Sequence, residues 1–341
     1  MKFCLSIALV LLHTTVFFIA GESQVSPPPA KQVRAAVSAL AFSPDGAMLA
    51  VGRYREVELL DPASGQVKAT LRGFENQVRG VAFSPDGRQL VAVGGNPGQF
   101  GEVRLFDPSK GTEIRAWRGH RDHVTSVAYA PDGRTIATAS YDRTIRLWNP
   151  ATGTELQTLR DHTDAVFALA YSPDGKFLAS ASADRTVKVW DPLTGRRLST
   201  LGDALDAVNA LAFAPASAKD GRILAGGGAD RTIHIWQLSE NGEGKRLRSL
   251  IAHEDAIVAI AYAPDGLSLA TSAGDRSLRI WNPATLVETR TLETQPDWVQ
   301  ALAFSPDGRW VAAGRFDGAL SIYGAMNGQK RRMASIDKDP R

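Results

Sequence analysis

The chain has 341 residues, 44% of them apolar, and a formal net charge of +3. This composition is typical of a protein that folds around a core, and it excludes an intrinsically disordered chain. The positive excess lies in the last eighteen residues: this tail carries +3 and Lys2 carries +1, which leaves −1 for the remainder. A body so close to neutral offers no continuous charge to a polyphosphate, so we expect no nucleic-acid partner.

The first 23 residues have the pattern of a secretory signal peptide. Lys2 precedes an apolar run over residues 3–20, and small residues follow it. We expect residues 1–23 to be removed and the protein to be exported to the periplasm, the cell surface or the medium. The alternative is a retained membrane anchor, because about 18 residues reach the lower limit for a span. The sole cysteine, Cys4, lies in this segment, so the mature chain would form no disulfide.

Residues 24–36 include three consecutive prolines and are predicted to form an extended spacer. Seven copies of one unit follow, each marked by a turn that usually reads Ser/Ala-Pro-Asp-Gly. The prolines of these turns are Pro44, Pro85, Pro131, Pro173, Pro215, Pro264 and Pro306.

Each unit predicts a meander of four antiparallel strands. In the third unit, residues 124–129, 136–140, 145–148 and 155–159 have strand periodicity, and Pro and Asx residues separate them. A sheet of about 42 residues cannot cover both of its faces alone, so the units must stack into a ring. We therefore expect an all-β fold, a seven-bladed β-propeller of four-stranded antiparallel blades over residues 37–336. Residues 337–341 would be a C-terminal tail.

Two segments compete for the outer strand of the seventh blade. Residues 22–30 precede the first unit but contain the three prolines, which donate no ladder hydrogen bonds. Residues 328–336 follow the last unit and are predicted to form this strand, with the ring closed by packing alone.

The units resemble those of the WD-repeat family from residue 37 to about residue 336. The most specific feature is a His before the first strand, a Ser or Thr in the second, an Asp in the next turn and a Trp in the third strand. The resemblance implies that these four side chains form a buried hydrogen-bonded relay. Three units carry the full set: His120, Thr138, Asp142 and Trp148; His162, Ser180, Asp184 and Trp190; His253, Thr271, Asp275 and Trp281.

The other units depart from this pattern. The fifth and seventh units lack both the His and the hydroxyl, as expected if a half-satisfied relay leaves a buried polar group unpaired at about 1 to 3 kcal/mol. Leu60 and Phe106 stand at the Trp position of the first two units. His234, in the third strand of the fifth unit, is expected to be an ordinary strand residue.

The His, Ser/Thr and Asp of each relay also have the residue types of a catalytic triad. A triad needs one exposed nucleophile and an oxyanion site, whereas here the set occurs three times at equivalent places, which favours a structural role. His120, Asp122 and His123 are too few for a metal site. We expect no enzyme activity, no cofactor and no metal.

The turn Asp is followed by an arginine in four units, and the first unit has an arginine at the matching place. These residues are Arg55, Arg143, Arg185, Arg231 and Arg276. Five aspartates precede the first strands on the same face: Asp122, Asp164, Asp206, Asp255 and Asp297. We expect the two sets to form ion pairs, with partner binding as the alternative. Tyr141, Trp298 and Phe316 lie in or beside these loops and are candidate anchors for a partner.

The resemblance implies a non-catalytic, exported scaffold that binds a protein of unknown identity through this face. We expect a monomeric ring that meets a membrane only if the N-terminal segment is retained. The alternative is a propeller enzyme, or a ligand- or metal-binding module, that acts at the axial channel. It requires acidic or His residues at the inner ends of the first strands, which read Ser, Ala, Thr, Val and Asn.

Overall fold

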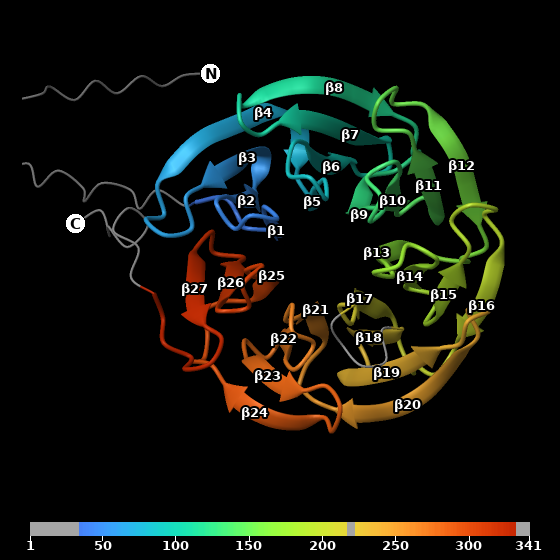
Figure 1. Cartoon of the computed structure of the whole chain (residues 1–341), viewed down its shortest axis with the longest axis vertical. Helices are drawn as coiled ribbons and strands as arrows, with labels where there is room; N and C mark the ends of the chain where they lie inside the picture. The colour runs from blue at the N-terminus through green and yellow to red at the C-terminus, as the bar shows by residue number, and fades with distance from the viewer. Residues whose placement is uncertain (1–33, 217–221, 332–341) are drawn as a thin grey trace, which may run out of the picture. The chain divides into compact units, whose positions relative to one another are not determined.

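The computed structural model describes residues 34–216 and 222–331. Every regular element in these ranges is a β-strand, and they include no helix long and apolar enough to cross a membrane. The strands form seven antiparallel sheets that follow one another around a common axis (Figure 1). The predicted seven-bladed β-propeller is therefore confirmed.

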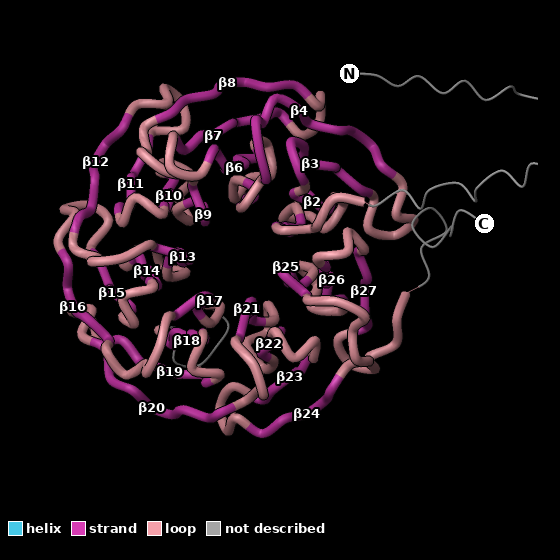
Figure 2. The backbone as a smooth tube through the Cα atoms, turned by 180° about the vertical axis from the view of Figure 1, so that it is seen from behind, coloured by secondary structure: helices cyan, strands magenta, loops and turns pink. Residues whose placement is uncertain are grey.

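Within each blade the strands run in chain order from the axis outward, as both views of the ring show (Figures 1 and 2). Blades 1 to 4 consist of β1 (Ala39–Phe42), β2 (Leu49–Gly52), β3 (Tyr54–Leu60) and β4 (Val67–Gln77); β5 (Gly80–Phe83), β6 (Leu90–Asn96), β7 (Phe100–Asp107) and β8 (Thr112–Arg118); β9 (Val124–Tyr129), β10 (Ile136–Ser140), β11 (Thr144–Trp148) and β12 (Glu155–Arg160); β13 (Val166–Tyr171), β14 (Leu178–Ser182), β15 (Val187–Trp190) and β16 (Arg197–Leu201). Blades 5 to 7 consist of β17 (Val208–Phe213), β18 (Ile223–Gly228), β19 (Thr232–Leu238) and β20 (Gly244–Ile251); β21 (Ile257–Tyr262), β22 (Leu269–Ala273), β23 (Leu278–Asn282) and β24 (Val287–Thr291); β25 (Val299–Phe304), β26 (Trp310–Arg315) and β27 (Leu320–Gly324).

The antiparallel order assigns the turns to two opposite faces of the ring. The turns between second and third strands lie on the same face as the connections from one blade to the next, and we call this the loop face. The other turns, including the Pro-centred ones, lie on the opposite face, which we call the hairpin face. Backbone hydrogen bonds join the two kinds of loop on the loop face, for example from Ala183 N–H to Ala165 O at 2.9 Å.

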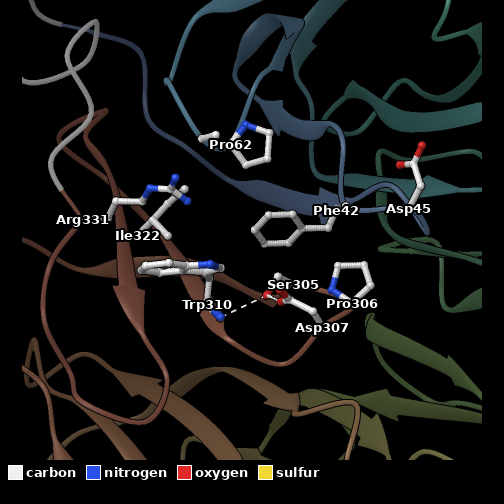
Figure 3. Close-up of a pocket in the computed structure, with 11 residues that line it drawn as sticks. Phe42, Asp45, Pro62, Ser305, Pro306, Asp307, Trp310, Ile322 and Arg331 are labelled. Atoms are coloured by element: carbon white, nitrogen blue, oxygen red, sulfur yellow. Dashed lines mark hydrogen bonds between the residues drawn. The ribbon is translucent and has the colours of Figure 1, made fainter.

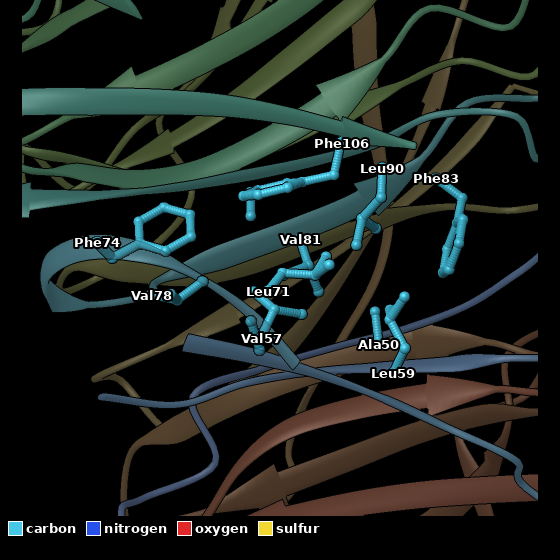
Figure 4. Packing of buried hydrophobic residues seen from close by; sticks show 12 residues of the cluster. Ala50, Val57, Leu59, Leu71, Phe74, Val78, Val81, Phe83, Leu90 and Phe106 are labelled. Carbon is cyan, nitrogen blue, oxygen red and sulfur yellow. The ribbon is translucent and has the colours of Figure 1, made fainter. Parts of the chain in front are cut away.

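Apolar side chains fill the space between neighbouring blades. Between blades 1 and 2, Leu59 and Leu71 pack against Leu90 and Phe106, and all four are almost fully buried (Figure 4). Second strands are buried along all or nearly all of their length, as in β10, because a blade lies on each side of them. This burial explains why these strands are built from small and apolar residues.

On the hairpin face, the Pro-centred turns of adjacent blades meet. Asp45 Oδ1 accepts hydrogen bonds from the Ser43 hydroxyl (2.6 Å) and the Ala47 N–H (3.0 Å), which fixes the turn. Gly46 follows with a φ of +70°, and a Cβ built on it would lie 3.7 Å from Pro306 Cδ of blade 7. The same contact recurs between Gly87 and Pro44, Gly133 and Pro85, Gly175 and Pro131, and Gly308 and Pro264. Turn chemistry and blade stacking thus use the same residues.

Blade 7 closes the ring against blade 1. Val37, Leu49 and Val51 pack on Ala312 and Ile322. Closure also includes hydrogen bonds, so packing does not act alone: Val37 N–H donates to Arg315 O at 2.9 Å, and Arg53 Nη1 donates to Gly318 O at 2.9 Å.

The outer strand of blade 7 lies largely beyond the described residues. Three strands of this blade are described, together with one antiparallel bridge between Tyr323 and Lys330. Arg331 N–H continues that pairing to Ile322 O at 2.7 Å. Both contacts lie at the start of the segment 328–336 that we predict to be the fourth strand, and residues 332–336 fall outside the described part of the chain.

Candidate functional site

The three complete sets of relay residues each form one continuous chain of hydrogen bonds. In blade 3, Trp148 Nε1 donates to Thr138 Oγ1 (2.8 Å), this hydroxyl contacts His120 Nε2 (2.8 Å), and His120 Nδ1 contacts Asp142 Oδ2 (3.0 Å). The corresponding distances are 2.8, 2.8 and 2.7 Å for Trp190, Ser180, His162 and Asp184 in blade 4. They are 2.8, 2.7 and 3.3 Å for Trp281, Thr271, His253 and Asp275 in blade 6.

Burial favours the neutral forms of two relay histidines, His162 and His253, whereas hydrogen bonds favour the charged forms of the relay aspartates. Desolvation lowers the pKa of His162 and of His253 against the opposing effect of their aspartates. Burial alone would raise the pKa of Asp275, but hydrogen bonds from the Ser277 hydroxyl and backbone N–H lower it to about 2. Asp142 has its pKa lowered in the same way, by His120 among others, against the cost of burial.

Each relay connects two parts of a blade by hydrogen bonds: its His and Asp lie in loops of the loop face, and its Trp lies in the third strand. The hydroxyls of Thr138, Ser180 and Thr271 are fully buried, and each already accepts a hydrogen bond from a tryptophan. A nucleophile must be open to its substrate, so the triad-like triplets have no access for chemistry.

Blade 5 contains a different polar network in place of the relay. Trp236 Nε1 donates to Asp203 Oδ2 at 2.9 Å, and His234 Nε2 contacts Asp230 Oδ2 at 2.9 Å. His234 is 4% exposed and stacks on Trp236 with ring centroids 5.4 Å apart. His234 thus lies in a strand as expected, and the sequence did not indicate its buried contacts with Asp230 and Trp236. Gly226 replaces the hydroxyl because a Cβ there would come within 2.8 Å of the Trp236 ring.

Blade 7 likewise replaces the relay with another set of polar groups. Gln295 is 1% exposed, and its Nε2 donates to the Tyr323 hydroxyl at 3.0 Å. That hydroxyl also donates to Glu293 Oε1 at 2.9 Å. The expected joint loss of His and hydroxyl is thus accompanied by compensating partners, which satisfy the buried groups that remain.

Blades 1 and 2 bury charged groups that the sequence patterns did not single out. Glu102 is 2% exposed and accepts hydrogen bonds from Glu75 N–H (3.1 Å) and Arg104 Nε (3.1 Å). Arg53 is 7% exposed and pairs with Glu58 at 2.6 Å. These pairs occur once each, so the repeat pattern of the sequence does not predict them.

The five arginines of the loop face share an unusual backbone conformation. Their φ angles lie between +63° and +69°, in the left-handed region. The residues are Arg55, Arg143, Arg185, Arg231 and Arg276, and all five side chains are exposed.

These arginines do not form the expected ion pairs. Within the described residues, no ion pair joins any of them to Asp122, Asp164, Asp206, Asp255 or Asp297. All five aspartates instead accept a hydrogen bond from the next backbone N–H, as Asp164 does from Ala165 at 2.7 Å, and Asp122 also contacts His123 Nδ1. The tight turn, rather than pairing between the two loops, sets the position of each arginine.

The three aromatic candidates belong to two clusters on the loop face. Tyr141 stacks on His123 with centroids 4.4 Å apart and contacts Phe167 of blade 4 at 5.6 Å. The ring centroids of Trp298 and Phe316 lie 6.3 Å apart in blade 7. This pair is equivalent to His123 and Tyr141, because in both pairs the N–H of the second residue donates to the carbonyl of the first. Tyr141, Trp298 and Phe316 remain about half exposed.

The inner ends of the first strands hold neighbouring blades together. The Thr125 hydroxyl donates to Val166 O at 2.6 Å, Asn209 Nδ2 donates to Ile257 O at 2.9 Å, and Ser38 donates to Val78 O. No group of three or more His, Cys, Asp and Glu side chains that could hold a metal ion occurs in residues 34–216 and 222–331.

A pocket of about 210 Å³ lies on the hairpin face at the junction of blades 7 and 1 (Figure 3). Phe42, Pro62 and Trp310 form apolar walls, and the guanidinium of Arg331 lies 4.7 Å from the Trp310 ring centroid. The chain's own cation thus covers one face of this indole, and Trp310 is only partly buried in the packing between the blades.

Comparison with protein families gives one match, to the WD domain, G-beta repeat, over residues 65–96, 111–149, 153–191, 195–237, 244–282 and 286–323. Each matched segment begins near the outer strand of one blade and ends in the next blade. The first three strands of blade 1 precede the first segment, consistent with the missing relay in that blade. No curated protein matches the chain.

Proposed function

Because the chain belongs to the WD-repeat family, whose propellers commonly act as protein-interaction scaffolds, we propose that it is an exported, non-catalytic scaffold that holds a protein partner on its loop face. The supporting observation is the state of the side chains on that face. Five exposed arginines and three half-exposed aromatics lie there, and none of these arginines forms an ion pair within the described residues. Arginine and aromatic side chains contribute most of the energy of typical interfaces.

Export is the part of the proposal that rests on the sequence alone. The lysine and apolar run at the N-terminus support a signal peptide, and residues 1–33 lie outside the described part of the chain. Fractionation of the native host and N-terminal sequencing of the protein test it. A new N-terminus near residue 24 in an envelope or medium fraction supports export, whereas an intact Met1 in the cytoplasmic fraction contradicts it.

The scaffold role is tested by cross-linking the protein in its native host and identifying captured proteins by mass spectrometry. A loop-face variant would carry alanine at Tyr141, Trp298 and Phe316 and asparagine at the five arginines, since asparagine tolerates positive φ. A matched control would carry alanine at three exposed apolar residues of the hairpin face, Leu193, Leu267 and Met326. We expect the loop-face variant alone to lose the partner; unchanged capture would contradict the proposal.

The alternative of a ligand- or metal-binding site at the axis is tested by calorimetric titration of the purified protein with divalent metals and simple saccharides. Heat of binding from either would favour the alternative of a ligand- or metal-binding module at the axis. A silent titration is the expected result, because Thr125 and Asn209 at the axial ends are already bonded to the next blade.

A further inference from the structure

The exposed charges of the loop face are divided unequally between two parts of the ring. In blades 2 to 4, Arg79, Arg121, Arg143 and Arg185 are exposed and form no ion pair within the described residues. We call these four residues the cationic sector. The solvent-accessible carboxylates among them are Asp122, which binds His123 (2.8 Å) and the Gly98 N–H (2.8 Å), and Asp164. The turn aspartates Asp142 and Asp184 also lie here, but their side chains are only 6% exposed and are hydrogen-bonded to His120 and His162. Exposed cations therefore outnumber solvent-accessible carboxylates in this sector.

Blades 5 to 7 show the opposite balance. Asp206, Glu254, Asp255 and Asp297 lie on the loop face there, with Arg231 and Arg276 beside them. None of these six side chains forms an ion pair in the described part of the chain. Arg315 of blade 7 is largely buried and is paired with Asp317. The equal numbers of arginines and aspartates in the two repeated sets therefore conceal a charge separation across the face.

An aromatic pair lies within the cationic sector. Tyr141 lies in the same turn as Arg143, which the hydrogen bond from Arg143 N–H to Ser140 O closes, and Phe167 belongs to the next blade. Tyr141 is stacked on the buried ring of His123, whose Nδ1 is bonded to Asp122, so its position is fixed before any partner arrives. A fixed and half-exposed aromatic loses little conformational entropy on binding, which makes it a good anchor.

Building on the proposed scaffold function, we propose that the cationic sector binds an acidic protein segment, with an aromatic or apolar side chain of that segment packed against Tyr141 and Phe167. Arginine donors recognise carboxylates, and the aromatic pair offers an adjoining apolar contact. A nucleic acid fits less well, because Asp122 and Asp164 interrupt the cations and would repel a continuous phosphate backbone.

The probe for this site is a fluorescein-labelled random copolymer of glutamate and tyrosine, titrated with the purified protein by fluorescence anisotropy at low and moderate salt. The test variant is R143N/R185N and the matched control is R231N/R276N. Both remove two charges from turns with φ between +63° and +69°, and asparagine tolerates that conformation in both. We expect the test variant to weaken binding about tenfold and the control to change it less than about twofold.

Two further probes test the chemistry of the partner. Tyr141→Ala should weaken binding of the glutamate–tyrosine copolymer about fivefold and affect a glutamate–alanine copolymer much less. An oligothymidylate of similar charge should bind more weakly than either copolymer. Tighter binding of the oligothymidylate, or equal losses in the two double variants, would overturn the assignment.

These results remain distinct from the test of the scaffold role. Suppose that a host protein is captured through the loop face but the two double variants bind the copolymer equally well. This result would contradict the proposal for the cationic sector and support the scaffold role. Copolymer binding through the cationic sector without capture of any host protein would support the proposal for the sector and contradict the scaffold role.

Discussion

The indole nitrogen of Trp236 donates to Asp203 Oδ2, whereas the tryptophans at the same place in blades 3, 4 and 6 donate to a threonine or serine hydroxyl. Blade 5 thus satisfies the same buried donor with a residue from the loop that precedes its first strand. The fold requires an acceptor for this N–H and tolerates different residues in that role.

Asp203→Ala should lower the free energy of unfolding by about 1 to 3 kcal/mol, because it leaves the buried Trp236 N–H without an acceptor. Asp203→Asn retains a carbonyl oxygen at the same position and should recover at least half of that loss. Equilibrium denaturation of both variants measures the difference. Equal losses would show that the charge of Asp203, which also pairs with Arg246, matters more than the hydrogen bond.

Acid should destabilise the protein first through His162 and His253. The pKa values of His162 and His253 are lowered from 6.5 in the folded state, so the unfolded chain binds more protons as the pH falls below that value. The free energy of unfolding should therefore decrease from about pH 6.5 downward. A second loss of unfolding free energy should begin below about pH 4. There the relay aspartates, including Asp275, are protonated in the unfolded chain but stay charged in the folded state, because folding lowers their pKa.

Denaturation series at pH 7.5, 6.5 and 5.5 check the first window. His253→Gln removes one titrating group, so its unfolding free energy should change less between pH 7.5 and 5.5 than that of the wild type, whatever its stability at pH 7.5. An identical pH dependence in the two proteins would contradict the assignment to this histidine.

Arg143→Val should destabilise the protein by about 1 to 2 kcal/mol, because a β-branched residue fits the left-handed conformation poorly. Arg143→Gly should be neutral or stabilising, since glycine adopts this φ without steric cost. Arg121→Val is the control: Arg121 lies nearby and is exposed, but it does not have positive φ. It should change stability by less than about 0.5 kcal/mol in the same denaturation assay.

Gly314→Ala should weaken ring closure. A Cβ at this position would come within 2.2 Å of Val37 Cγ1, across the junction of blades 7 and 1, and overpacking of this kind costs about 1 to 3 kcal/mol. Gly202→Ala is the matched control because no atom lies within 4 Å of its added Cβ and its φ is not positive. Thermal unfolding should show a lower Tm for Gly314→Ala only, and limited proteolysis should find faster cleavage next to that junction.

The sequence was sufficient to predict the blades because their turns recur with the same chemistry. Proline, aspartate and glycine at Pro44, Asp45 and Gly46 have local conformational preferences that do not depend on distant residues. By contrast, His234 reaches Asp230 and Trp236 through a side-chain orientation that strand periodicity does not encode. The buried Arg53 and Glu102 likewise have partners in separate segments: Arg53 donates to Gly318 O, and Glu102 accepts from the Glu75 N–H.

The conformation of the loop-face arginines did have a signal in the sequence. Gly318 follows Asp317 at the place where Arg143 follows Asp142, and it has a φ of +82°. A glycine at one of several equivalent turn positions indicates that the backbone is left-handed there. That comparison would have favoured a turn requirement over the expected ion pairs.

The seam of glycines and prolines on the hairpin face, where Gly46 meets Pro306, lies at the opposite ends of the strands from the exposed arginines. Random mutation of the loop face can therefore leave this blade-to-blade fit intact. The binding preference of the protein should therefore be able to change without loss of its fold. A library varied at Arg143, Arg185 and Tyr141 would sample new binding preferences while each member keeps the seven-bladed propeller.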